Sequence, residues 1–525
     1  MSQHLINVTS TGTLGQIAID AIARYPDRPM ISDGKTIWTY RDLGHAIGRY
    51  MTALRGMGVE RGEGIAVLSA NRVEPWALLC AANLMGIRYT PMHPMAAEDD
   101  HVHIVEDSGA TTLVIDADKF AERGVAIRNR VESLDRLVSL GECDQAIDLL
   151  AAATDVEPLP LEDHAQSEET AYLVYTGGTT GRSKGVMLSH RSLVTMSTVI
   201  ASEWEWPATP RYAIVTPISH AGGINLYPIM FLGGYARLLQ GWDTEQFCAT
   251  VAEDRLNCAF LVPTIINNLI DASEVRARHD LSSIELLIYG AAPMSPDRLR
   301  QGIAIFGQVF LQLYGQSECP QCVTTLRKAD HDPDRPDRLG SCGRPTLLSQ
   351  IKLFDREMRE VAPGEPGEIC VRGPLVMSGY WNQPELTQAA FAGGWLHTGD
   401  VGIRDADGYL TIVDRTKDMI ISGGFNIYPR EVEDALASHP AVSLAAVIGV
   451  PDARWGEAVK AFVIMHPGAS ATAAELQAHV KKKRGAPWAP KSVEIVKDIP
   501  LTGLGKLDRK ALRIPYWEGR DRAVS

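Results

Sequence analysis

Short apolar runs that suit buried strands alternate with helical patterns along most of this chain, and this alternation constrains the fold more than any other feature. The strand-like runs are residues 64–69, 112–115, 172–176, 212–217, 258–263, 285–289 and 309–313. Helical patterns such as 73–84 and 294–306 lie between them. This alternation predicts α/β layers with mostly parallel strands. Ligands bind such sheets at the carboxyl ends of the strands, where most of the motifs below lie.

The pattern changes twice toward the C-terminus. Residues 350–414 are rich in strand and turn signals, and a smaller α/β segment follows. A chain of 525 residues is too long for one compact core. We therefore expect an N-terminal core at 1–414, built of layered α/β subdomains and a β-rich subdomain. A hinge at 414–418 and a small, mobile α/β domain at 419–525 complete the prediction.

Composition excludes several classes of protein. Apolar residues make up 45% and charged residues 22%, as in ordinary globular proteins. A net charge of −13 argues against sequence-independent binding of nucleic acid. No signal peptide or membrane-spanning stretch is apparent, and the most apolar segment, 213–235, is interpreted as buried loop and strand. Eight scattered cysteines favour free thiols in a reducing compartment, so we expect a cytoplasmic protein. A homodimer is left open.

Cys319 and Cys322 form a C-x-x-C pair. A zinc site of this type needs a second pair at suitable spacing, whereas Cys342 and Cys370 stand alone. The pattern therefore favours two unpaired thiols near a pocket wall over a metal site.

A loop rich in glycine and hydroxyl side chains follows the strand-like run 172–176. Its sequence from Thr176 to Val186 is TGGTTGRSKGV. Backbone N–H groups in such a turn converge on anions, and Lys184 adds positive charge, so a polyphosphate is the natural ligand. Arg182 and Ser183 separate Gly181 from the lysine, which departs from the Walker A pattern, and the loop also lacks G-x-G-x-x-G. Taken alone, it could still be a plain surface loop.

The loop resembles the phosphate-binding signature of the adenylate-forming superfamily, which includes acyl-CoA synthetases, adenylation domains and firefly-type luciferases. Further stretches resemble that family's motifs in the same order along nearly the whole chain. They are YGAAP at 289–293, QLYGQSE at 312–318, WLHTGD at 395–400, DRTKD at 414–418, GGFNIYP at 423–429 and GLGK at 503–506.

The resemblance implies a reaction in two halves. A carboxylate attacks the α-phosphate of ATP to give acyl-AMP and pyrophosphate, and a thiol, usually that of coenzyme A, then displaces AMP. The residues expected to contact ATP or AMP are Thr176, Gly177, Gly178, Thr179, Thr180, Gly181, Lys184, Gly290, Ala291, Ala292, Gln312, Tyr314, Gly315, Gln316, Ser317, Asp400, Ile412, Arg415 and Lys506.

Glu318 and several of the residues expected to contact ATP have chemistry that suits a specific role. Glu318 offers the carboxylate oxygens that Mg²⁺ prefers. Tyr314 offers a flat face to adenine. Asp400 can accept both ribose hydroxyls, with Arg415 beside it, although the two could equally form a plain salt bridge. Lys506, in a glycine-flanked loop, is implied to be the catalytic cation, because it can meet negative charge as that charge develops.

The remaining implied roles concern the acyl group and the thiol. His220 is expected to gate or orient the substrate, although a lone buried histidine is more often structural. The implied acyl pocket contains His220, Gly222, Gly223, Ala291 and Leu313. The implied coenzyme A contacts are Ser422, Gly423, Gly424 and Phe425, and Lys417 is the implied pivot of the hinge. The apolar pocket segments favour a hydrophobic acid, which could be medium- or long-chain fatty, aromatic or ring-bearing.

The leading prediction is an ATP-dependent acid–CoA ligase that acts on small molecules. The alternatives are a ligase that loads a carrier-protein thiol, a luciferase-like enzyme, and a catalytically inactive nucleotide-binding protein. The presence of Lys506, Glu318 and Asp400 together argues against the last. The basic run 481–484 is interpreted as a solvated helix face.

Overall fold

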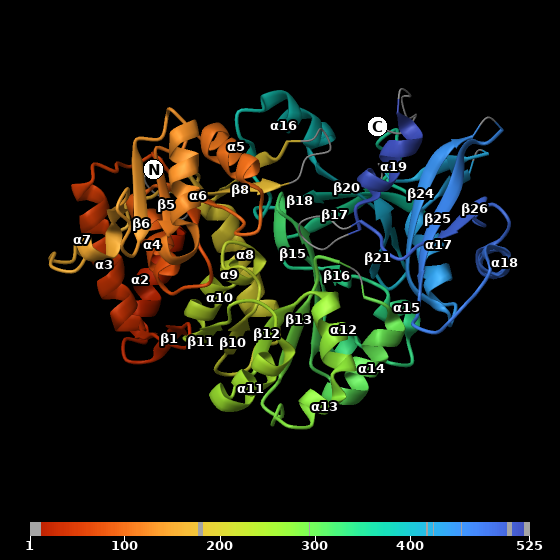
Figure 1. The fold of residues 1–525 in the computed structure, drawn as a ribbon, viewed down its shortest axis with the longest axis horizontal. Coiled ribbons are helices and arrows are strands. Elements are labelled where there is room, and N and C mark those ends of the chain that lie inside the picture. Colours follow the sequence, from red (N-terminus) through yellow and green to blue (C-terminus); the bar gives the residue numbers. More distant parts are fainter. Residues whose placement is uncertain are drawn as a thin grey trace, which may run out of the picture. The chain divides into compact units, whose positions relative to one another are not determined.

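The computed structural model describes residues 12–176, 182–292, 294–415, 418–423, 425–452, 454–500 and 507–518. The chain divides into two compact units. Unit 1 is Met1–Gln350 with Val371–Leu396, and unit 2 is Ile351–Cys370 with His397–Ser525. The predicted α/β class, with a larger and a smaller part, is confirmed (Figure 1). The predicted domain boundary and hinge at 414–418 stay predictions, because compact units need not coincide with the bodies that move.

A nine-stranded sheet forms one layer of the described part of unit 1. Its strands, in spatial order, are β16 (Arg344–Pro345), β15 (Cys319–Leu326), β14 (Phe310–Gln316), β13 (Leu286–Tyr289), β12 (Cys258–Leu261), β10 (Arg211–Ile214), β11 (Tyr235–Leu238), β1 (Pro29–Ser32) and β2 (Ile37–Thr39). The central strands, from β14 to β1, are parallel, and antiparallel strands close both edges.

An eight-stranded sheet forms the second layer described in unit 1. Its order is β19 (Gly379–Tyr380), β9 (Lys184–Ser189), β8 (Thr170–Thr176), β4 (Arg88–Pro91), β3 (Gly64–Leu68), β5 (Thr112–Asp116), β6 (Arg136–Leu140) and β7 (Ile147–Asp148). The strands from β8 to β7 are parallel, whereas β9 and β19 pair antiparallel.

Helices cover the faces of both sheets. They are α2 (Leu14–Arg24), α3 (Tyr40–Gly56), α4 (Glu74–Met85), α5 (Glu98–Ser108), α6 (Ala117–Arg130), α7 (Leu149–Ala152), α8 (His190–Glu203), α9 (Ala221–Ile224), α10 (Leu226–Phe231), α11 (Thr244–Asp254), α12 (Pro263–Asp271), α13 (Ser273–Arg276), α14 (Pro296–Phe306), α15 (Pro336–Leu339) and α16 (Pro384–Ala390). Helices α11, α12 and α14 bury apolar side chains such as Phe247, Leu269 and Leu299 against the nine-stranded sheet (Figure 1).

Local sequence signals explain where several helices begin. Thr39 and Asp42 form a reciprocal capping box at the start of α3, so each satisfies a backbone N–H that the first turn leaves free. Pro75 stands in the first turn of α4, where no N–H is needed, and Gly86 ends that helix with a φ of 69°.

The segment 213–235 contains helix, which corrects the interpretation of it as loop and strand. Helices α9 and α10 lie between β10 and β11. Pro228 falls in the first turn of α10, where a missing N–H costs little, and nearly every residue of that helix is buried. Tertiary burial therefore outweighs the weak local helix propensity of a stretch rich in glycine and proline.

Unit 2 contains two further sheets among its described residues. The first has the order β17 (Gln350–Phe354), β18 (Pro366–Arg372), β20 (Leu396–Arg404) and β21 (Leu410–Arg415). The second has the order β23 (Phe425–Ile427), β22 (Ile420–Ser422), β25 (Gly456–Met465) and β24 (Val442–Asp452), with β26 (Ser492–Ile495) beside β25. Its helices are α17 (Pro429–Ala437), α18 (Ala473–Arg484) and α19 (Arg509–Trp517). Side chains of α17 and α18 pack on β24 and β25 to form the core.

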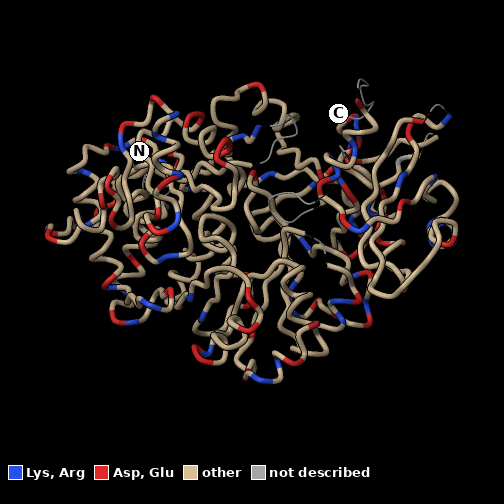
Figure 2. The backbone as a smooth tube through the Cα atoms, in the orientation of Figure 1, with Lys and Arg blue, Asp and Glu red and all other residues tan. Residues whose placement is uncertain are grey.

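Charge is mixed along both units, with acidic and basic residues interspersed over the backbone (Figure 2). None of the helices in the described ranges combines the length and the apolar character that crossing a bilayer requires.

All eight cysteines are free thiols, as the sequence predicts. Cys319 and Cys322 are buried on β15, three residues apart. The pairing of β14 with β15 changes register between Cys319 and Thr324, and Gln321 has a φ of 57°, so the two thiols lie on an irregular part of the strand. Neither thiol belongs to a group of three metal-ligating side chains within the described residues.

Candidate active site

A β-hairpin carries the glycine-rich loop. β8 ends at Thr176 and β9 begins at Lys184, and these two residues are register partners. At the end of the loop, the carbonyl of Ser183 accepts a hydrogen bond from His103 Nε2 at 2.9 Å. The Ser183 hydroxyl is buried and has no hydrogen-bond partner among the described residues, so it is available as a donor. The expected contacts Gly177, Gly178, Thr179, Thr180 and Gly181 lie outside the described residues.

Lys184 lies beside Glu318 and Tyr380. Its Nζ is 3.6 Å from Glu318 Oε1 and 3.8 Å from the centroid of the Tyr380 ring. The Tyr380 hydroxyl donates to the same Oε1 at 2.8 Å. Burial lowers the pKa of Lys184, and the nearby Glu318 carboxylate opposes that shift. Two predicted residues from distant parts of the chain thus meet at the base of the loop, and Tyr380 holds the carboxylate in place.

Glu318 suits a hard divalent cation. Both contacts of its carboxylate fall on Oε1, and Oε2 accepts no hydrogen bond from the described residues. A carboxylate with a free oxygen is a ligand that Mg²⁺ favours. The residues present at this position therefore fit the cation that the sequence implies.

The residues expected near adenine lie at the carboxyl ends of β13 and β14. Tyr289 and Gln312 are register partners, and the Tyr289 hydroxyl oxygen lies 3.4 Å from Gln312 Oε1. Ala291 has a φ of 64°, a left-handed conformation that is uncommon for a residue with a side chain. A Cβ at Gly290 would stand 2.6 Å from Leu313 Cδ1, so this glycine lets the leucine pack against the backbone. Ala292, Tyr314, Gly315, Gln316 and Ser317 continue the same two strand ends.

His220 has a second imidazole beside it. It precedes α9, its Nδ1 lies 2.8 Å from the Ser219 hydroxyl, and its ring meets the edge of His93 at a centroid distance of 4.6 Å. Burial, together with the neighbouring His93, lowers the pKa of His220 to about 4. The Nδ1 of His93 accepts a hydrogen bond from the backbone N–H of Met95. Both rings therefore stay neutral at ordinary pH.

Two glycines of the expected acyl pocket have a steric reason to be glycine. A Cβ at Gly222 would collide with the Thr216 hydroxyl, and one at Gly223 would collide with the carbonyl of Ile218. The side-chain amide of Gln321 donates to the carbonyl of Ala221 at 3.1 Å, which ties β15 to the start of α9.

In unit 2, Asp400 and Arg415 face each other across β20 and β21. They are register partners, and Arg415 Nε lies 3.2 Å from Asp400 Oδ1. The Asp400 side chain is 8% exposed and that of Arg415 is 51% exposed. The salt bridge considered from the sequence is therefore present, and Arg415 remains accessible. Ile412 lies on the same strand, opposite Gly402.

Asp414, at the start of the expected hinge, is buried. Its Oδ1 accepts from the backbone N–H of Arg415 at 2.7 Å and its Oδ2 from that of Arg430 at 2.9 Å. Burial raises the pKa of Asp414 to about 7, and Arg509 opposes that rise. The pivot Lys417 lies outside the described residues.

The expected coenzyme A loop is partly described. Ser422 is buried at the end of β22, and Gly423 turns with a φ of 58° against the Trp455 ring. The backbone N–H of Gly423 donates to the carbonyl of Trp455 at 2.8 Å. Phe425 is 51% exposed. Gly424 and the catalytic candidate Lys506 lie outside the described residues.

Comparison with known proteins decides the family. Residues 19–381 match the family described as AMP-binding enzyme, and residues 431–506 match the AMP-binding enzyme C-terminal domain. The chain belongs to the AMP-binding enzyme family. It is an AMP-forming acid–thiol ligase.

Similar proteins support this assignment over the full length. The chain is 42% identical to the medium/long-chain-fatty-acid–CoA ligase FadD8 of Mycobacterium tuberculosis, covering 97% of this chain and 91% of that protein. It is 34% identical to a feruloyl-CoA synthase of an Amycolatopsis species, covering 95% and 98%. Among solved structures, the amide bond synthetase McbA of Marinactinospora thermotolerans is similar with a TM-score of 0.89 and 31% identity, covering 96% and 99%.

The sequence interpretation did not include Tyr380 or His93. No local spacing links Tyr380 to Glu318, because 62 residues separate them. His93 follows the carboxyl end of β4 in the stretch Pro91-Met92-His93. The rule that polar residues at the carboxyl ends of parallel strands gather at the ligand could therefore have identified it.

Proposed function

We propose that this ligase activates a hydrophobic carboxylic acid with ATP and transfers the acyl group to coenzyme A. The cluster of Lys184, Glu318 and Tyr380 at the base of the glycine-rich loop carries the proposal, because it combines a phosphate-binding cation with a carboxylate that can hold Mg²⁺. The similarity to FadD8 favours a medium- or long-chain fatty acid as substrate. The lower similarity to feruloyl-CoA synthase makes an aryl acid the second choice.

In the first half-reaction an oxygen of the substrate carboxylate forms a bond to the α-phosphorus of ATP. The bond from that phosphorus to the bridging oxygen breaks, and pyrophosphate leaves with the electron pair. Lys184 and the hydroxyls of Thr176 and Ser183 bind the β- and γ-phosphates. Magnesium, when bound, neutralises phosphate charge, and Glu318 holds it in position. Such charge stabilisation by preorganised groups is the largest single term in most enzymes of this kind.

The remaining nucleotide contacts fix the position of the α-phosphate. Gln312 binds the edge of adenine and Tyr314 stacks on its face, while Asp400 accepts the ribose hydroxyls and Arg415 donates to the same sugar. Lys506 meets the charge that develops on the α-phosphate and the attacking carboxylate.

In the second half-reaction the thiol loses its proton to solvent and its sulfur bonds to the acyl carbon. The bond from that carbon to the phosphate oxygen breaks, and AMP leaves with the electron pair. His220, neutral because burial lowers its pKa to about 4, orients the acyl carboxyl group and gates the thiol. Residues 422–425 contact the pantetheine arm. Rotation about the hinge at Lys417 replaces the arrangement used for adenylation with the arrangement used for thioester formation. The pocket segments 220–227, 263–267 and 289–292 contain no lysine or arginine, which favours an acid with an uncharged tail.

A carrier-protein thiol is the alternative acceptor. The chain is 31% identical to a fatty acid–[acyl-carrier-protein] ligase of Streptomyces coeruleorubidus. A cytoplasmic location and a homodimer stay predictions.

The test is mass spectrometry of the products formed from ATP, Mg²⁺, coenzyme A and a panel of acids that runs from acetate through octanoate and palmitate to cinnamates. We expect acyl-CoA and AMP from octanoate or palmitate. The variant Lys506→Ala should lose acyl-AMP formation while it still binds ATP. Acyl-AMP without acyl-CoA would point to the carrier protein, and wild-type adenylation in the variant would overturn the role of Lys506.

A further inference from the structure

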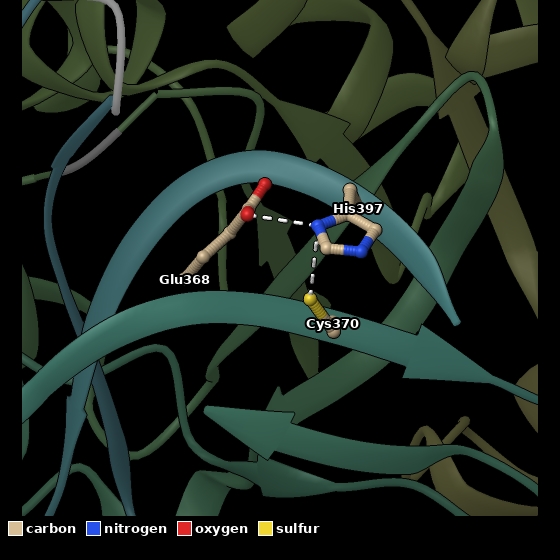
Figure 3. Close-up of side chains that lie close together, drawn as sticks. All are labelled: Glu368, Cys370 and His397. Atoms are coloured by element: carbon tan, nitrogen blue, oxygen red, sulfur yellow. Dashed lines mark hydrogen bonds and ion pairs between the residues drawn. The ribbon is translucent and has the colours of Figure 1, made fainter. Parts of the chain in front are cut away.

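Three side chains able to bind metal converge in unit 2, outside the nucleotide contacts. Glu368 and Cys370 lie two residues apart on β18 and so point to the same face of the sheet. His397 stands near the start of the neighbouring strand β20 and points toward both (Figure 3). The Thr398 hydroxyl donates to the carbonyl of Ile369 at 2.6 Å, which fixes the two strands in this register.

The distances among the three side chains are close to those of a metal site. His397 Nδ1 is 2.8 Å from Glu368 Oε2 and 3.6 Å from Cys370 Sγ, and the three ligand atoms all lie within 4.8 Å of one another. In a tetrahedral zinc site, bond lengths of about 2.3 Å to sulfur and about 2.1 Å to nitrogen or oxygen place sulfur and nitrogen about 3.6 Å apart, and nitrogen and oxygen about 3.4 Å apart. The sulfur–nitrogen distance already fits, the nitrogen–oxygen distance is roughly 0.6 Å too short, and the sulfur and oxygen atoms lie within 4.8 Å of each other, against about 3.6 Å in the tetrahedron.

Two of the three side chains in this cluster reach solvent. The side chains of His397 and Glu368 are 18% and 25% exposed, whereas Cys370 is fully buried beneath them. An ion can therefore reach the carboxylate and the imidazole from solvent, and the thiol sulfur lies within 4.8 Å of their ligand atoms. A simple ion pair between His397 and Glu368 does not need a thiol next to the same imidazole nitrogen, whereas a metal site with a sulfur ligand does.

We propose that Glu368, Cys370 and His397 form a binding site for a thiol-seeking divalent cation of the zinc type, separate from the magnesium position at Glu318. Sulfur with imidazole and carboxylate is the ligand set that zinc accepts, whereas magnesium takes oxygen ligands. Binding replaces the thiol proton, which passes to solvent. A neutral imidazole keeps its proton on Nε2 and binds the cation through Nδ1. Water completes the coordination.

The site is linked to the turn before Asp400. Glu368 Oε1 accepts from the backbone N–H of Gly399 at 3.0 Å, and the Thr398 hydroxyl accepts from that of Asp400 at 3.1 Å. A cation that shifts Glu368 therefore acts on the turn that carries Asp400. An effect on ATP affinity follows, and this consequence rests on the proposed contact of Asp400 with ribose.

The test is a titration of the chelator-treated full-length protein with Co²⁺, which gives a thiolate-to-cobalt charge-transfer band when sulfur binds. We expect a band that saturates at one equivalent, disappears with stoichiometric Zn²⁺ and persists with excess Mg²⁺. Cys370→Ser should abolish the band. Cys143→Ser, the same change at a partly exposed thiol elsewhere, should preserve it.

A second variant keeps the test decisive if loss of Cys370 impairs folding. His397→Gln retains the thiol and should weaken Co²⁺ binding by more than the roughly 10–100-fold that loss of an outer hydrogen-bond partner costs. Absence of the band in the wild type, or an undiminished band in Cys370→Ser, would overturn the site. This readout does not require ligase activity, so its failure is distinct from failure of the proposed function. An ATP affinity that Zn²⁺ leaves unchanged would overturn the link to Asp400.

Discussion

Removal of the Tyr380 hydroxyl tests whether this residue positions Glu318 for catalysis. Tyr380→Phe deletes the 2.8 Å hydrogen bond to Glu318 Oε1 and keeps the ring that lies 3.8 Å from Lys184 Nζ. The variant therefore separates the hydrogen bond from the cation–π contact. Tyr380 is 6% exposed, and phenylalanine keeps the buried ring, so the packing of the fold should change little.

The size of the effect follows from the geometry. A hydrogen bond to a charged group contributes about 1.5–3 kcal/mol. The Glu318 side chain is 14% exposed, so water can replace part of the lost contact, and the lower end of that range applies. A loss of about 1.5–2 kcal/mol corresponds to a decrease of roughly 10–30-fold in kcat/KM for adenylation. The concentration of Mg²⁺ needed for half-maximal rate should rise as well.

The assay is acid-dependent exchange of labelled pyrophosphate into ATP, measured over a range of Mg²⁺ concentrations. Tyr40→Phe is the matched control, because it removes a buried hydroxyl that donates to the carbonyl of Gly234 at 2.8 Å. That variant should lose stability and keep the wild-type exchange rate. Wild-type exchange and Mg²⁺ dependence in Tyr380→Phe would refute the reasoning.

Three further outcomes are expected. Asp400→Asn weakens the hydrogen bonds that Asp400 accepts from the ribose hydroxyls, so the KM for ATP should rise roughly 10–150-fold with the fold intact. An unchanged KM in steady-state kinetics would contradict the ribose contact. His93→Ala removes the ring beside His220, a contact of about 0.5–1.5 kcal/mol. It should slow thioester formation roughly 2–10-fold in single-turnover assays and leave pyrophosphate exchange unchanged. Equal slowing of both reactions would indicate that the His93 ring has only a structural role. Burial raises the pKa of Asp414 from 3.8 to about 7. Between about pH 4 and pH 7 the folded chain therefore holds more protons than the unfolded chain, and the contribution of Asp414 to stability should fall as the pH rises through this range. The difference in denaturant midpoint between the wild type and Asp414→Asn should follow that decline, whereas a difference independent of pH would contradict the buried carboxyl.

The sequence predicted most of the architecture because hydrophobic periodicity is a local signal. The runs 64–69, 112–115 and 258–263 correspond to β3, β5 and β12, with ends that differ by two residues at most. Their apolar residues are buried on both faces, so a parallel strand can be recognised in the sequence as a continuous apolar run. The helices α9 and α10 were missed because they depend on burial that local propensity does not express.

The candidate site was predictable where the chain itself carries the geometry. Lys184 and Glu318 were proposed from their motifs and lie 3.6 Å apart. Tyr380 could not be predicted from the sequence, because its contact with Glu318 depends on the pairing of β19 with β9, which no nearby residue encodes. The Glu368, Cys370 and His397 cluster likewise depends on the pairing of two strands.

The register between Asp400 and Arg415 determines which changes of length this protein tolerates. A tight turn joins the two strands, with the backbone N–H of Asp405 donating to the carbonyl of Tyr409 at 3.0 Å. One residue inserted there would slip β21 by one position and turn Arg415 to the opposite face of the sheet. Two inserted residues would restore the face and leave Arg415 about 7 Å too far along the strand. An engineer who seeks a site for a tag or a sensor domain should therefore avoid this turn, although its surface position makes it look permissive.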